Sequence, residues 1–504
     1  MLVHGYGIAA HPTLFLPVSN AIISYVAQHI PTVFTLPGFI TLEIVLLFLS
    51  LWGIIYYLLR TSISLSMLLL VASLLCLRPV LLPQYTVTAG LLIIAAFLFL
   101  VLCAKEKNAF YALIGVIFAW SGFLLRQQQF FLTLLITTPF FILLPRGTCF
   151  PSRKTTIVIA ASIITLCTIS SVIDYKSKHS PELRKYTEFL DAMIPVWNYG
   201  AGRALQQRPD ILEKYQYSAN DIKLLNSHFY ETDQYTDTKT IRQMLIELGT
   251  AYKYDNGVSN GVMSLKAFFN PQLFPLILLS LALCCLLPLQ GRERLVFISS
   301  LFLTLTIFFF IGALGRPGQL RIYFPVAALL VLLPVTLFYS NTGKWRRNTP
   351  CPQMAALFVA AACLLWHGTH MLPLAQQRTE WSLAARNAMN TLPDNEPIFS
   401  WGGIFPYEAI YPVFGDWRRF EKYDIPLFGG YTSAPFSTTT TKAKEGKGFL
   451  DLMQSPAGVL AFENLQGRCT SLLTVFAREH LGCEVRCEKK TYLPKVNIVR
   501  TRCQ

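Results

Sequence analysis

Apolar residues gather in ten blocks along the chain, and two long polar segments, 174–270 and 373–504, interrupt and follow them. A helix needs about 20 mainly apolar residues to cross the hydrocarbon core of a bilayer, and each block comes near that length. The pattern predicts membrane-spanning helices near residues 36–59, 62–77, 85–104, 109–125, 129–145, 155–173, 271–290, 295–314, 322–340 and 354–372.

The polar segments predict structure outside the membrane. Periodicity favours helices over 181–193 and 239–249 in the first segment. In the second it favours helices near 378–392 and 470–481, with strands near 397–401, 457–462 and 484–500. The expected fold is an α-helical polytopic membrane protein of about ten spans, divided into an exported loop with an amphipathic segment (1–35), six spans (36–173), an exported helical loop domain (174–270), four spans (271–372) and an exported C-terminal α+β domain (373–504).

Composition supports a membrane protein and excludes other classes. Hydrophobic residues make up 53% of the 504 residues and charged residues only 14%, whereas a soluble domain carries about 25% charged residues. Cytosolic enzymes, disordered chains and fibrous proteins are therefore excluded. The formal net charge of +15 comes mostly from basic residues at the ends of apolar blocks, as expected for topology signals, so we expect no nucleic-acid partner.

Basic residues divide unevenly between the two sets of alternating short loops. Cytoplasmic loops are the richer in Lys and Arg, so the richer set indicates the cytoplasmic face. Both polar segments then lie on the exported side, which is the periplasm for a bacterial inner membrane. The exported set holds Arg78, Arg126, Arg316 and Arg321, and the cytoplasmic set holds Arg60, Lys105, Lys107, Arg146, Arg153, Lys154, Arg292, Arg294, Lys344, Arg346 and Arg347.

Four cysteines lie in the C-terminal segment, where an exported domain retains disulfides. Their spacing lacks the tight pairs of a zinc ribbon. The sequence predicts one or two disulfides and leaves the connectivity open among Cys469, Cys483, Cys487 and Cys503.

The start of the chain is unusual for this topology. Residues 1–35 would lie outside, yet neither a span nor a recognisable signal peptide stands before them in the sequence. We expect a first membrane helix to belong before Met1, through a misassigned start or a truncation. The alternative is that the first span carries a short tail across the membrane.

Several short sequence motifs follow one another along the chain, and their order is informative when they are taken together. They are His11-Pro-Thr-Leu-Phe-Leu-Pro-Val-Ser-Asn20, Gln84-Tyr-Thr-Val-Thr-Ala89, Trp120-Ser-Gly-Phe-Leu-Leu-Arg126, Tyr217-Ser-Ala-Asn-Asp221, Tyr230-Glu-Thr-Asp233, Leu314-Gly-Arg316-Pro-Gly-Gln-Leu-Arg321 and Phe399-Ser-Trp-Gly-Gly-Ile-Phe-Pro-Tyr-Glu408.

This arrangement resembles bacterial membrane glycosyltransferases of the GT-C type, a class that includes O-antigen glucosyltransferases and protein mannosyltransferases. The resemblance implies sugar transfer from a polyprenyl-phosphate donor to an exported glycan or lipid acceptor. Membrane lipid is a further expected partner. Metal dependence varies within that class, so the resemblance requires no cofactor and allows Mg²⁺ or Mn²⁺. The chain departs from the class in one respect: its first exported loop lacks the usual acidic residues, and Glu43 is the first acid in the sequence.

Two kinds of side chain could carry the chemistry at the exported ends of the spans. Glu43 is a carboxylate inside the first span, where it is either a base or metal ligand facing a cavity or a solvated interfacial acid. Arg126, Arg316 and Arg321 offer planar guanidinium groups that match phosphate oxygens. They either bind the donor phosphate or extend toward lipid headgroups.

Further candidates lie in the exported segments. His11 and Asn20 belong to the first loop, and Asp221 and Asp233 to the first polar segment, where each is either a ligand of the acceptor or a surface or capping group. Asp233 is also a candidate catalytic acid. Trp401 either stacks on a sugar or packs in the core of the C-terminal domain.

Two other functional classes remain open. One is a transporter or flippase of a lipid-linked or polar solute, although internal repeats and polar helices at the membrane midplane are not evident. The other is a catalytically inactive scaffold protein. Phosphate-binding loops, zinc-protease motifs and nucleophile elbows are absent from the sequence.

Overall fold

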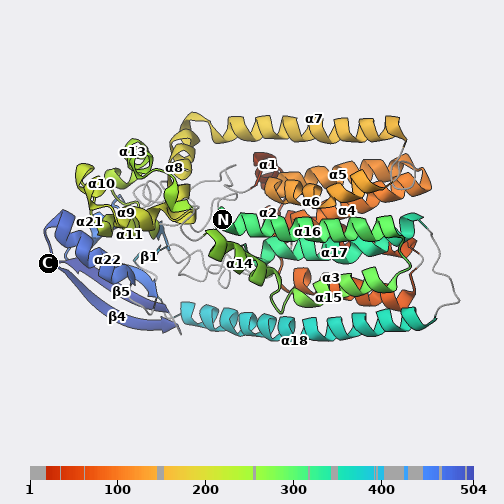
Figure 1. Cartoon of the computed structure of the whole chain (residues 1–504). Coiled ribbons are helices and arrows are strands. Elements are labelled where there is room, and N and C mark those ends of the chain that lie inside the picture. Colours follow the sequence, from red (N-terminus) through yellow and green to blue (C-terminus); the bar gives the residue numbers. More distant parts are fainter. Residues whose placement is uncertain are drawn as a thin grey trace.

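The computed structural model is elongated, with a helical bundle along one part and a mixed helix and sheet domain at one end of it (Figure 1). We refer to that end of the bundle as the domain end. The structure describes residues 19–504 apart from 34–35, 62, 145–151, 254–256, 316–317, 342–349, 391, 393–395, 402–424, 429–445, 465–467 and 494–495.

Ten apolar helices form the bundle in the described part of the chain, which confirms an α-helical membrane protein. Six are long and apolar enough to cross a membrane: α2 (Gly38–Arg60), α4 (Tyr85–Glu106), α7 (Arg153–Lys178), α16 (Gly291–Ala313), α17 (Leu320–Asn341) and α18 (Pro350–Met389). The four shorter ones are α3 (Leu65–Leu81), α5 (Ala109–Leu125), α6 (Gln127–Leu143) and α15 (Phe274–Leu286).

The centre of the bundle is the packing of α4 against α17. These helices bury 89% and 94% of their apolar windows, whereas α7 buries only 6%. Close approach depends on Gly90 of α4, because a Cβ atom there would stand 2.4 Å from Cβ of Pro325 in α17. A side chain at position 90 would therefore push the two central helices apart.

Two expected boundaries differ from the structure. The expected span 271–290 is a helix of only 13 residues that ends at Leu286, because Pro288 restricts the residue before it and cannot donate to a continuing helix. The expected span 354–372 and the expected helix 378–392 are one helix, α18, which continues through Pro373. Neighbouring helices let a spanning helix tolerate an internal proline.

The first polar segment folds into short helices. They are α8 (Pro181–Asn198), α9 (Ala201–Gln206), α10 (Pro209–Lys214), α11 (Ala219–Asn226), α12 (Asp233–Thr236) and α13 (Thr238–Leu248), followed by α14 (Gly257–Phe268), which packs on the bundle. The first helix of the described chain, α1 (Ala21–His29), lies at the domain end of the bundle near α7 (Figure 1).

The C-terminal segment forms a five-stranded sheet of order β2-β1-β3-β5-β4. Strand β1 lies parallel to β2 and β3, and β5 is antiparallel to β3 and β4. A disulfide joins Cys483 to Cys503, while Cys487 carries a free thiol. The elements are β1 (Ile398–Trp401), β2 (Leu427–Phe428), α21 (Phe449–Met453), β3 (Val459–Asn464), α22 (Arg468–Phe476), a π-helical turn (Ala477–Leu481), β4 (Val485–Leu493) and β5 (Val496–Cys503). The side chain of Cys469 lies outside the described residues.

Described residues of the two polar segments share one hydrophobic core. Phe229 from the first segment contacts Trp401 and Phe476 from the second. All three side chains are buried. Joining the segments removes these aromatic side chains from water. We call the joined unit the composite domain.

Substitution of Gly90 tests the central helix contact. Gly90→Ala should lower the melting temperature of the purified protein in detergent, because the added methyl overpacks the contact with Pro325 at a cost of about 1–3 kcal/mol. Gly368→Ala is the matched control, since a Cβ atom there meets nothing within 4 Å. Equal melting temperatures for the two variants would contradict the packing described here.

Candidate functional site

Residues 19–21 lock α1 onto the end of the bundle. Asn20 accepts a hydrogen bond from the backbone N–H of Ile22 at 3.0 Å and donates through Nδ2 to the carbonyl of Ser170 in α7, also at 3.0 Å. Asn20 is only 1% exposed to solvent. Asn20 is therefore a helix cap and a link between helices, and this geometry argues against the expected role as a sugar ligand.

Asp174 completes that lock and is a residue that sequence reasoning missed. One carboxylate oxygen accepts from the backbone N–H of Ala21, and the other pairs with Nζ of Lys178, each at 2.8 Å. Lys178 also donates to the carbonyl of Ser19. The signal in the sequence is a lone acid at the end of an apolar block, since an acid at that depth needs a partner.

The other expected residues at the domain end are differently placed. Glu43 is half-buried in the second turn of α2, and no hydrogen bond or ion pair joins it to a described residue. Arg126 is half-buried between α5 and α6, where its backbone ends one helix and begins the next. Arg321 is half-buried in the first turn of α17. His11 and Arg316 lie outside the described residues.

The strongest feature of the domain end is Arg78, near the C-terminus of α3. The residue is 5% exposed, and its Nε and Nη1 atoms are buried without a hydrogen bond to any described residue. Its guanidinium carbon lies 5.4 Å from the ring centre of Phe324 in α17. A buried charge normally pairs with an opposite charge, and the described part of the chain provides none here.

The surroundings of Arg78 add positive charge and polar groups. Arg378 of α18 is near enough to repel the guanidinium electrostatically. His367 of α18 is fully buried against the backbone of Gln272, and neither ring nitrogen makes a well-aligned hydrogen bond within the described residues. Gln129 of α6 also buries an unpaired Nε2 atom, beside the Gly90–Pro325 contact. Arg378 itself is exposed. We call Arg78, His367 and Arg378 the Arg78 cluster.

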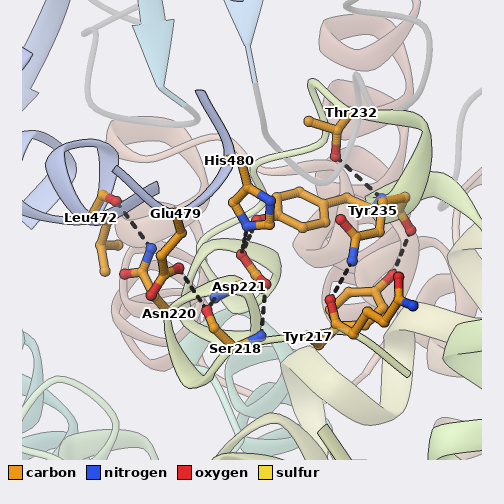
Figure 2. Close-up of polar contacts among 11 residues, drawn as sticks. Tyr217, Ser218, Asn220, Asp221, Thr232, Tyr235, Leu472, Glu479 and His480 are labelled. Atoms are coloured by element: carbon orange, nitrogen blue, oxygen red, sulfur yellow. Dashed lines mark hydrogen bonds and ion pairs between the residues drawn. The ribbon is translucent and has the colours of Figure 1, made fainter. Parts of the chain in front are cut away.

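A second polar group lies inside the composite domain. Figure 2 shows Asp221 beneath His480, with Tyr235 and Ser218 beside it. One oxygen of Asp221 accepts from the hydroxyl of Tyr235 and lies 2.8 Å from Nε2 of His480. The other accepts from the backbone N–H of Ser218 at 2.7 Å, which closes a capping box at the start of α11. Asp221 is thus buried and saturated, which argues against contact with an acceptor.

Burial also affects the tyrosines around Asp221. Removal from water raises the pKa of the Tyr235 hydroxyl, and the hydrogen bond to Asp221 raises it further. Burial likewise raises the pKa of Tyr217, and the charges of Asp237 and Asp221 act in the same direction. Both hydroxyls therefore stay protonated and act as hydrogen-bond donors near neutral pH.

Asp221, Glu479 and His480 are the described residues that could hold a metal ion, with one ligand atom from each within 4.8 Å of the others. Glu479 is exposed and accepts from the hydroxyl of Ser218 at 2.8 Å. The oxygens of Asp221 already accept three internal hydrogen bonds. The arrangement serves better as a polar clasp between the two segments than as a metal centre.

Two remaining candidates also have structural surroundings. Asp233 is exposed as the first residue of α12, where a carboxylate favours the positive end of the helix. Trp401 is 4% exposed on β1, and its Nε1 atom donates to the carbonyl of Ser227 at 2.7 Å. Its ring therefore packs in the core and offers no open face to a sugar.

Comparisons with known proteins do not add a functional assignment. Models of known protein families do not match the chain, and a search of curated proteins finds no significant match. Function is consequently inferred from the chemistry of the described residues.

Replacing the buried carboxylate tests the polar clasp. Asp221→Asn should lower the stability of the composite domain by about 1–3 kcal/mol, because an amide cannot accept all three hydrogen bonds. Thermal unfolding and limited proteolysis of the full-length protein measure the change. Asp233→Asn is the control, since the same substitution at an exposed position should have little effect. If both variants melt alike, the clasp does not stabilise the domain.

Proposed function

We propose that this chain is a membrane glycosyltransferase-like protein of the GT-C type, which transfers a sugar from a polyprenyl-phosphate donor to an exported acceptor. It would cross a bacterial inner membrane about ten times, with the composite domain on the periplasmic side. The uneven division of basic residues among the loops supports this orientation. The resemblance of the sequence strings to that class supports the reaction.

The observation that carries the proposal is the uncompensated charge of Arg78. Ionisable residues within membrane spans are expensive and by default functional. A guanidinium group without a carboxylate partner, beside Arg378 and His367, is suited to an anion, and its planar fork matches a phosphate. Arg126 and Arg321 lie at the same end of the bundle and are proposed to assist in binding the donor.

The reaction proposed is an inverting displacement at the anomeric carbon. A hydroxyl oxygen of the acceptor forms a bond to that carbon while the bond from carbon to the phosphate oxygen of the donor breaks. The acceptor proton passes to a carboxylate base, for which Glu43 is the candidate at the domain end of α2. Arg78 stabilises the negative charge that develops on the leaving polyprenyl phosphate, which is the step where preorganised charge lowers a barrier.

A transporter of an anionic solute is the second candidate, because the buried guanidinium of Arg78 with the exposed Arg378 beside it also suits the passage of an anion. The two candidates differ in what happens to the substrate. An enzyme breaks the bond between sugar and phosphate, whereas a transporter moves the substrate intact. Measurement of covalent transfer therefore separates them.

Substitution of Arg78 tests the proposed function. In membrane vesicles supplied with polyprenyl-phosphate sugars and total exported glycolipid, Arg78→Ala should reduce sugar transfer by about 100-fold or more, because the leaving phosphate loses its main charge partner. Arg78→Lys should recover part of the activity, since it restores the charge without the planar fork. Arg153→Ala, at an exposed position of α7, should leave transfer unchanged.

Two outcomes would contradict this assignment. Full transfer by Arg78→Ala at normal expression would remove Arg78 from the donor site. Movement of an intact anionic substrate that depends on Arg78, without any covalent transfer by the wild-type protein, would replace the enzyme by a transporter.

A further inference from the structure

Helix α7 stands at the side of the bundle and leaves a large apolar groove next to it. The groove has a volume of about 960 Å³ and lies between α7 and helices α4, α5 and α6. One face of α7 lines it with side chains that recur every three or four residues, including Ala160, Ile164, Cys167 and Lys176. The facing wall is rich in phenylalanines of α4 and α6.

The groove lies within apolar helices, so what fills it in a membrane is hydrocarbon. An unfilled space of this size would forfeit the dispersion contacts of its lining. Its lining extends along α7 from Thr156 to Lys176, which is about 30 Å at 1.5 Å per residue. That length equals the whole hydrocarbon core of a bilayer.

Length distinguishes the occupant. The acyl chain of a phospholipid stays within its own leaflet, which is about 15 Å deep as half of that core. A single chain that follows the groove from end to end must be longer, as a polyprenyl chain is. The groove therefore favours a polyprenyl lipid over the phospholipids of the surrounding bilayer.

Charge at the domain end of the groove favours an anionic headgroup. Lys176 is exposed there and forms no ion pair with a described residue. The nearby carboxylate of Asp174 is already occupied by Lys178 and by the backbone of Ala21. A lysine at the end of an apolar helix can bind the phosphate of a lipid at the membrane surface.

The groove and the Arg78 cluster lie on different sides of the bundle. Figure 1 shows α7 along one side and α18, which carries His367 and Arg378, along the opposite side. Helix α7 contacts α1, α5 and α8, whereas α18 contacts α3 and α15. A lipid whose chain follows α7 presents its phosphate on the α7 side, away from Arg78. Donor and groove lipid are therefore separate molecules.

We propose that the groove along α7 binds the polyprenyl chain of a lipid-linked acceptor, with the acceptor phosphate at Lys176. This inference rests on the proposed function, which it narrows: the acceptor is a glycan attached to polyprenyl phosphate. The donor phosphate binds at Arg78, and the acceptor approaches from the α7 side.

Adjacent alanines of α7 provide a matched test. Both side chains are exposed, but Ala160 lines the groove and Ala161 does not. The full-length protein is placed in phosphatidylcholine nanodiscs, and binding of a 55-carbon polyprenyl phosphate is measured by native mass spectrometry. The wild-type protein and Ala161→Trp should bind two molecules. Ala160→Trp should bind one, with the second weakened about tenfold or more because the indole overlaps the chain.

Further variants in the same binding measurement distinguish this inference from the proposed function. Lys176→Gln should weaken binding in the groove, and Lys185→Gln, an exposed lysine of α8, should not. Arg78→Ala should remove the other lipid and leave the groove lipid bound. Equal binding by the two tryptophan variants, or equal displacement of the probe by phosphatidylglycerol, would overturn the inference. Binding in the groove without sugar transfer by the wild-type protein would overturn the proposed function and the acceptor role while chain binding stands.

Discussion

The contact of α4 with α17 at Gly90 and Pro325 determines how the rest of the bundle is arranged. These two helices are the most buried of the long spans, and their close approach brings Phe324 to Arg78 and Gln129 to the same region. Helix α3 supplies Arg78, and α18 supplies His367 and Arg378. Helix α7 is the least buried of the long apolar helices and borders the groove.

Two charged groups at the domain end of the bundle have opposite effects on the stability of the fold. Asp174 is paired with Lys178 and caps α1, so its charge stabilises the fold. Arg78 is buried with no anion among the described residues, so its charge costs free energy until a ligand supplies one. A cost of this kind persists where the group serves binding or catalysis, which is why Arg78 outweighs the other arginines in the proposed function.

The composite domain is held together by contacts between segments that are distant in sequence. Aromatic side chains around Phe229 form its core, and the pair of Asp221 with His480, 259 residues apart, lies at the edge of that core. Asp221 and Trp401 have structural roles inside this domain. The chemistry proposed for this protein consequently lies at the membrane surface, where the bundle meets the domain.

The sequence by itself determined the apolar helices and much of the exported secondary structure, because length, apolar runs and capping residues act locally. It also singled out Asp221 with its alternative as a helix cap, which the capping box with Ser218 explains. Only the tertiary structure decided that Arg78 is buried without a partner, that the two polar segments share one core and that α7 borders a groove. These features depend on which helices pack side by side, and packing between residues hundreds of positions apart leaves no periodic pattern in the chain.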